Sequence, residues 1–186
     1  KLKKGHPWEE WYEKTPFNPG NWKVRVRDLS LDGCVFHFIG SDRIPVEGQF
    51  DETNLSITGI QLLAADINIK GDTLRGNIQH MSARERCGLN LKKLRSNVTV
   101  SPNSSICENL YLETDHSKLK DYYAMHYKHF PAFNYYIDSV SMVARLKDAT
   151  IDQRDIAFFA PQLKQFPGVV VKLSGDGKGT VADLRV

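Results

Sequence analysis

The chain of 186 residues is long enough for one domain with a hydrophobic core, and 41% hydrophobic with 25% charged residues is ordinary for a soluble protein. The net charge of +3 is spread without a long run of one sign, and the aromatic residues are not interleaved with Arg and Lys, which argues against a nucleic-acid partner. No apolar run approaches the roughly 20 residues of a membrane-spanning helix, and residues 1–7 do not form a signal peptide. Three cysteines, Cys34, Cys87 and Cys107, allow at most one internal disulfide and have no metal-binding spacing.

The first forty-eight residues predict a lead-in segment, two strands and a loop. Residues 1–20 are rich in Trp, Pro and charge without an amphipathic period, so we separate them from a single β domain over residues 21–186. The alternation in Trp22–Phe38 predicts two strands, with Asp32-Gly33 as a bend or bulge between them. Pro and Gly within residues 40–48 indicate a loop.

The stretch from Leu55 to Leu119 repeats apolar and polar residues in alternation, with breaks at Gly, Asn and Asp. Because a strand places every second side chain on the same face, the odd-numbered apolar residues before the turn at Gly71-Asp72 are predicted to share one face. These residues are Leu55, Ile57, Leu63, Ala65, Ile67 and Ile69. Further strands are predicted around Leu74 and Ile78, Leu89 and Leu91, Val98 and Val100, and Ile106, Leu110 and Leu112.

The last third of the chain predicts more strands and one helical cap. Residues 118–136 gather aromatics and histidines, and are predicted to begin as a strand and end in a short helical turn. Alternation in residues 140–147 indicates a strand. Residues 152–163 carry the clearest helical signal, with a capping Asp152 and an apolar stripe, although Pro161 predicts that the helix is short or kinked. The helical cap consists of Ile156, Phe159 and Leu163.

Strand alternation resumes in residues 169–173, and glycines in the motif SGDGKGT (residues 174–180) are predicted to turn the chain into a last strand ending at Val186. That motif lacks the spacing of a phosphate-binding loop. With about nine strands and one or two short helices, the predicted fold is mainly β: a curled antiparallel sheet, open as a groove or β-taco.

Little in the sequence indicates catalysis. His126 and His129 could present two imidazoles from a helix, with Asp121 or His116 as a third metal ligand, but surface histidines are favoured because no further ligand is evident. No GxSxG motif, Cys–His pair or apolar carboxylate pair is present. We therefore predict no catalytic residue, no metal and no cofactor.

The apolar rows have two interpretations. Two sheets facing each other would bury the rows in a dry core, and the alternation by itself favours this sandwich. Alternatively, one curled sheet leaves an apolar trough for acyl chains. The candidate lipid-contacting residues are Leu55, Ile57, Leu63, Ile67, Ile69, Leu74, Ile78, Leu89, Leu91, Val98, Val100, Leu110, Leu112, Met142, Leu146, Val171 and Leu173.

Several segments resemble the TamB and AsmA-like envelope proteins, in the form found in Bacteroides-type bacteria. Lys70–Lys120 has a strand opening in Gly-Leu-Asn-Leu, a strand ending in Ser-Pro, and then a Leu-Tyr-Leu-Glu-Thr segment followed by Ser-Lys-Leu-Lys. The segment IDQRDIAFFAPQL (residues 151–163) and the closing LSGDGKGTVADL (residues 173–184) are similar to the membrane-proximal half of these proteins, and residues 22–38 to the AsmA-like opening strand pair.

The resemblance implies an internal part of a long periplasmic protein that is anchored in the inner membrane. Such a protein carries phospholipid between the inner and outer membranes through an apolar β-groove, and pairs with a BamA-like outer-membrane barrel through parts that lie outside this chain. The implied partners are phospholipid acyl chains. The alternative is a structural or assembly module whose sheet edges pair with strands of outer-membrane β-barrel proteins.

Overall fold

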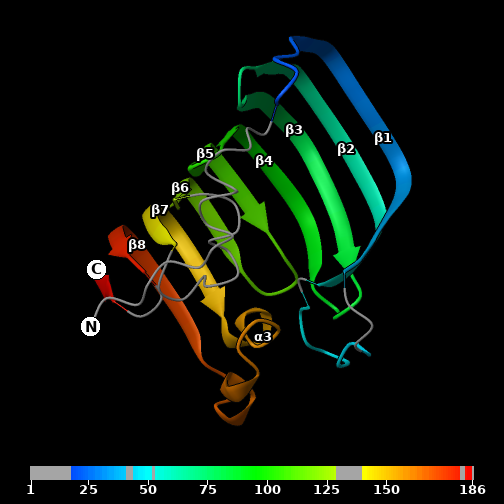
Figure 1. Ribbon diagram of the computed structural model, residues 1–186. Coiled ribbons are helices and arrows are strands. Elements are labelled where there is room, and N and C mark those ends of the chain that lie inside the picture. Colours follow the sequence, from blue (N-terminus) through cyan, green and yellow to red (C-terminus); the bar gives the residue numbers. More distant parts are fainter. Residues whose placement is uncertain (1–17, 41–43, 52, 129–139, 181–182, 186) are drawn as a thin grey trace, which may run out of the picture.

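All nine strands belong to one antiparallel sheet in which every strand lies beside its neighbours in the sequence (Figure 1). The computed structural model describes residues 18–40, 44–51, 53–128, 140–180 and 183–185. The sheet curves strongly but does not close, so β1 and β9 form its two edges. The predicted mainly-β fold with a curled, open antiparallel sheet is confirmed, and the sandwich is not, because no second sheet forms among the described residues.

The strands are long at the start of the sheet and shorter towards its end. Their bounds are β1 Val24–Ile39, β2 Asn54–Lys70, β3 Thr73–Glu85, β4 Asn90–Ser101, β5 Ser104–Glu113, β6 Lys118–His126, β7 Ser141–Asp152, β8 Val170–Gly179 and β9 Leu184–Arg185. Between β7 and β8 lie α3, Gln153–Ile156, and the 3-10 helix η2, Pro161–Gln165.

Tight turns between consecutive strands explain the simple order of the sheet. Lys70 pairs with Thr73, so Gly71 and Asp72 form the two-residue turn that the sequence predicts, with Gly71 at φ 55°. Ser101 pairs with Ser104 across a similar turn between β4 and β5. Such short connections can join only adjacent antiparallel strands.

The region predicted as two strands in Trp22–Phe38 is the single strand β1. Asp32-Gly33 forms a bulge within it: the register to β2 shifts between Leu31 and Cys34, and Gly33 has φ 63°. Glycine reaches this left-handed conformation without steric cost, so the chain bends while pairing continues on both sides.

The predicted glycine turn in residues 174–180 was wrong. Most of the motif lies in β8, where Gly175, Gly177 and Gly179 pair with Leu146, Ala144 and Met142 of β7. Gly175 and Gly179 do have positive φ, at 154° and 153°, but the backbone there stays extended. Alternate glycines therefore leave that end of the strand without side chains on one face.

The helix predicted over residues 152–163 is broken into two short pieces. The Asp152 side chain accepts a hydrogen bond from the Arg154 backbone N–H and caps α3 as predicted, but α3 ends at Ile156. Pro161 then begins η2 rather than continuing the helix, because proline lacks the backbone donor that an α-helix needs. Of the cap residues, Ile156 and Phe159 are exposed and only Leu163 is half-buried.

Among the described residues, the sheet forms a single layer over most of its area. Extensive contacts between elements join only neighbouring strands, apart from those of α3 with β7 and η2. The buried apolar residues are mostly small, and Val140 is the largest side chain that is fully buried. Among the described residues, the buried apolar cluster is Tyr127 with Val140, and Met125 packs against it.

Candidate functional site

One face of the sheet carries three apolar rows that run from strand to strand. Strand β4 shows that the three rows share a face. Its side chains alternate regularly from Leu94 to Val100, because the register shifts to both neighbours in this stretch come from extra residues in β3 and β5. The rows through Leu94, Val98 and Val100 therefore lie on the same side. We call this side the apolar face.

Cross-strand pairs define the three rows. The first is Val24, Ile69, Leu74, Val100, Ser105, Met125, Met142 and Gly179; the second is Gly76, Val98, Cys107, Tyr123, Ala144 and Gly177; the third is Leu31, Leu62, Met81, Leu94, Leu112 and Leu119. None of these residues is fully buried. Residues of the same row are paired across neighbouring strands, and no described element covers them from above.

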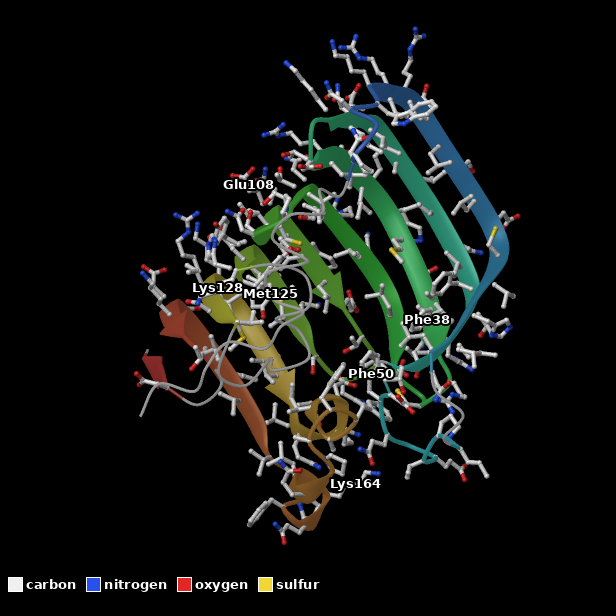
Figure 2. All side chains as sticks on the ribbon, in the orientation of Figure 1. Phe38, Phe50, Glu108, Met125, Lys128 and Lys164 are labelled. Atoms are coloured by element: carbon white, nitrogen blue, oxygen red, sulfur yellow. The ribbon has the colours of Figure 1, made fainter. Side chains whose placement is uncertain are left out.

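The opposite face is mainly polar. Its rows hold alternating charges, as in Lys93, Glu113 and Lys118, which pair in sequence across β4, β5 and β6. Cations also lie over aromatic rings, with the Arg145 guanidinium 4.3 Å from the centre of the Tyr122 ring. An apolar strip of Ile106, Ala124 and Val143 interrupts this face. Figure 2 shows Met125 on the side that the curve encloses and Glu108 on the outer side.

Two bulges in β2 change which residues face the apolar side. The register to β3 shifts between Thr58 and Gln61 and again between Ala65 and Asn68, beside Asp66 at φ 53°. Each bulge reverses the alternation, so Leu62 and Ala64 lie on the apolar face between the bulges. The prediction that Leu63 and Ala65 share the face of Ile67 was wrong, and Leu63 is 48% exposed on the other side.

Most of the other predicted lipid-contacting residues come together. Those in or next to the three rows are Ile67, Ile69, Leu74, Ile78, Leu91, Val98, Val100, Leu110, Leu112, Met142, Leu146, Val171 and Leu173. Leu55 and Ile57 pair with Phe38 and Phe36 of β1. Leu89 lies outside, in the turn before β4, where its carbonyl accepts a hydrogen bond from the Glu85 N–H at 2.9 Å.

Sequence analysis missed several members of the rows, among them Leu62, Met81, Leu94 and Leu119. The signal for the first was present, because Gly59 inside a strand pattern indicates a bulge. The residue type of Asp66 does not indicate the second bulge. The remaining residues were not grouped because their row follows from the pairing register, which is a property of several strands together.

One end of the curved sheet is closed by loops that meet from distant strands. The Phe50 N–H, in the loop between β1 and β2, donates to the Phe158 carbonyl at 2.8 Å, and the Phe50 and Phe159 rings lie 5.0 Å apart. The Lys164 Nζ donates to the Gly48 carbonyl at 3.2 Å. Figure 1 shows this loop and α3 together beyond the ends of the strands. We call residues 44–51 and 153–165, with the turn at 85–90, the capped end.

Buried polar side chains hold the capped end to the sheet. The Thr114 hydroxyl donates to the Asp155 carboxylate at 2.6 Å, and the Asp152 N–H donates to the Ser117 Oγ at 3.0 Å. Arg154 donates to both oxygens of Asp152, at 3.0 and 2.8 Å, and these bonds lower the pKa of Asp152 from 3.8 to about 2. All of these acceptors are satisfied, so the cluster is structural in character.

A second buried polar group lies at the turn between β3 and β4. The Glu85 carboxylate accepts hydrogen bonds from the backbone N–H groups of Cys87, at 2.6 Å, and Ser56, at 3.2 Å. Burial, and after it the hydrogen bond and charge of Glu85, raise the pKa of the Cys87 thiol from 9.0 to about 11. This cysteine is therefore protonated at neutral pH, which is the reverse of what nucleophilic or metal-binding chemistry requires.

The histidine metal site that the sequence analysis weighed and disfavoured does not form among the described residues. His126 lies in β6, so it is not on a helix with His129, and His129 lies outside the described residues. In the part of the chain that the structure describes, no three His, Cys, Asp or Glu side chains gather in a metal-binding group. Within the same residues, no helix has the length and apolar character needed to cross a membrane.

Two open hollows lie beside the apolar rows, with Leu91 in the wall of one and Leu173 in the wall of the other. Their volumes are about 340 and 360 Å³, and they lie over the bulges near Gly59 and Asp148. Their walls mix polar and apolar groups, and include Arg84 and Lys92 in one and Lys172 in the other.

Comparison with protein-family models, curated proteins and solved structures finds no match to this chain.

Proposed function

We propose that the apolar face binds lipid acyl chains and that the chain is a segment of a lipid conduit of the TamB and AsmA-like kind. The observation that carries this proposal is the row of Leu62, Met81, Leu94, Leu112 and Leu119, which crosses five strands without a covering layer among the described residues. A soluble protein rarely leaves such a continuous apolar surface without a partner.

The physical character of this face suits acyl chains. Each methylene group that leaves water for an apolar surface contributes about 0.8 kcal/mol, so a chain lying along the rows is held without any head-group contact. Nine strands at roughly 4.8 Å spacing give the face a width of roughly 38 Å. Binding of this kind needs no catalytic residue, in keeping with the chemistry of the sequence.

The curvature of the sheet supports the same proposal. Contacts at the capped end join the β1–β2 loop to the β7–β8 connection, which keeps the sheet bent around its apolar side. A bent sheet surrounds a bound chain on more than one side, and thereby removes more of the chain from water than a flat surface does.

Native mass spectrometry of the chain purified without detergent tests the proposal. We expect phospholipid to copurify, and we expect Ile67→Asp and Leu112→Asp to abolish its retention because a carboxylate in the rows must be desolvated. Thr99→Asp is the matched control, since Thr99 neighbours Val98 and Val100 but pairs with Arg75 on the polar face. His126→Ala is a second control.

Lipid-free protein, or equal loss of lipid in Thr99→Asp and Leu112→Asp, would contradict the proposal. Circular dichroism of each variant separates loss of lipid from loss of the fold.

A second candidate function is pairing with strands of client outer-membrane proteins. The observation that favours it is the edge of β8, where β9 pairs with only Lys178 and Gly179 and the exposed residues Val169, Val170 and Val171 are left beyond it. An edge with exposed valines is suited to strand addition. A Val170→Pro variant that loses client binding but keeps phospholipid would favour this function over the conduit.

A further inference from the structure

We propose that β1 is a self-complementary edge through which two copies of this chain pair antiparallel, so that their two sheets form one continuous sheet. In the described part of the chain, β1 pairs only with β2, and no described strand pairs with the backbone N–H and C=O groups of its other edge. This surface is independent of lipid binding and lies outside the proposed function.

The first half of this edge is close to a palindrome. Counted from its two ends, apolar residues occupy matching positions, and a basic residue at one position matches an acidic residue at the other. Residues 23–32 are Lys-Val-Arg-Val-Arg-Asp-Leu-Ser-Leu-Asp. With the centre between Arg27 and Asp28, antiparallel pairing of two copies places Lys23 opposite Asp32 and Arg27 opposite Asp28. The same register places Val24 opposite Leu31, Val26 opposite Leu29, and Arg25 opposite Ser30.

The faces of these residues agree with the register. Val24 and Val26 pair with Ile69 and Ile67 of β2, and Leu29 and Leu31 pair with Ala64 and Leu62, so all four lie on the apolar face. In β2, the alternation of side chains reverses at Asp66, which lies between Ala64 and Ile67. Their partners Leu29 and Val26 follow the same reversal in β1. A twofold axis perpendicular to the sheet therefore joins apolar face to apolar face and charged residue to charged residue.

Other registers are poorer. A slip of two residues in one direction places Asp28 opposite Leu29, and a slip in the other direction places Val26 opposite Arg27. Charged residues on a free edge commonly prevent pairing with another strand. Here one antiparallel register places basic residues opposite acidic residues, so their charges favour pairing.

The charges concerned are available. Lys23, Arg25, Arg27 and Asp28 are exposed, and in the described part of the chain none of them, nor Asp32, forms an ion pair. Among the described residues, pairing would therefore not have to break an ion pair of these side chains.

A large aromatic residue extends the match by one more pair. Trp22 is 71% exposed, and the register places it opposite Gly33, beside which the space for a side chain is empty. Aromatic side chains commonly pack over a glycine on the neighbouring strand. Val35 and Phe36, which are 54% and 48% exposed, follow Gly33 closely in the sequence.

Sedimentation equilibrium of the whole chain with a charge swap tests the proposal. We expect the wild-type chain to be a dimer, and we expect Arg27→Asp and Asp28→Arg each to weaken dimerisation about tenfold or more, because each places like charges opposite each other twice per dimer. The double variant Arg27→Asp/Asp28→Arg restores opposite charges and should restore the dimer. Arg84→Asp, an exposed arginine on β3, is the control and should change nothing.

If a swap at the strand centre impairs folding, Lys23→Asp, Asp32→Lys and their double variant repeat the test at the ends of the segment, with circular dichroism to verify the fold. A monomer at all attainable concentrations would overturn the proposal. Failure of the double variants to restore the dimer would do the same, as would open-ended polymers, which would require the edge at β8. Lipid copurification is measured in parallel and does not depend on the outcome.

Discussion

The capped end and the apolar face are held in different ways. At the capped end, segments far apart in the sequence are joined by buried hydrogen bonds, such as that from Thr114 to Asp155. On the apolar face, neighbouring strands are joined by their backbone ladders, and the side chains above them stay half-exposed. Buried polar contacts therefore join distant segments at the capped end, whereas the described apolar rows are built from pairs between neighbouring strands.

The largest expected effect concerns thiol reactivity at the capped end. Cys87 is buried and its pKa is raised to about 11, so its thiolate fraction at neutral pH is about one hundredfold below that of an ordinary cysteine. We expect iodoacetamide to label Cys34, which is half-exposed, long before Cys87, as measured by mass spectrometry over time. Equal labelling rates in the native protein would show that the capped end opens readily. Protein unfolded in urea is the control in which the difference should vanish.

A deletion in the buried polar cluster should have the next largest effect. Asp155→Ala leaves the Thr114 hydroxyl without its carboxylate acceptor, and we expect a loss of about 2 kcal/mol in the free energy of unfolding. Leu112→Ala on the apolar face should cost about 1 kcal/mol, because only part of the leucine surface is removed from water. Urea denaturation measures both. The reverse order would mean that the apolar rows, and not the capped end, carry the stability.

Acid should weaken the capped end through Asp152. Its pKa is lowered in the folded protein, so the stabilisation is fully present above the unfolded value of 3.8 and is lost as the pH falls towards about 2. We expect Asp152→Asn to reduce the decrease in urea midpoint between about pH 5 and about pH 3, the range in which the unfolded carboxylate begins to take up protons. An unchanged decrease would exclude Asp152 as its source.

The smallest effect is expected within β2. Asp66 has φ 53°, a conformation that glycine adopts more easily, so Asp66→Gly should raise the free energy of unfolding by less than about 1 kcal/mol. Asp176→Gly, at a strand position without positive φ, is the matched control and should lower it. A loss of stability in Asp66→Gly would indicate that the aspartate side chain, rather than its backbone, forms the bulge.

The sequence predicts the kind of fold better than the details of the site. Alternation and turn residues such as Gly71-Asp72 are local signals, and they correctly gave strands in one mainly antiparallel β architecture. The error at Leu63 arose because a bulge reverses every side chain beyond it, and an Asp at φ 53° cannot be recognised from its residue type. The helix predicted over residues 152–163 is short, as Pro161 indicated, but it ends at Ile156 and Pro161 begins a separate 3-10 helix.

What the sequence determined by itself is the mainly β character, tight turns such as Gly71-Asp72, and the presence of apolar and polar rows, because short turns and two-residue periodicity act over a few residues. Only the tertiary structure showed that, among the described residues, no second sheet packs on those rows to form a sandwich core. That outcome depends on the curvature of one sheet and on contacts such as Phe50 with Phe158, which join residues more than a hundred positions apart and leave no local pattern in the sequence.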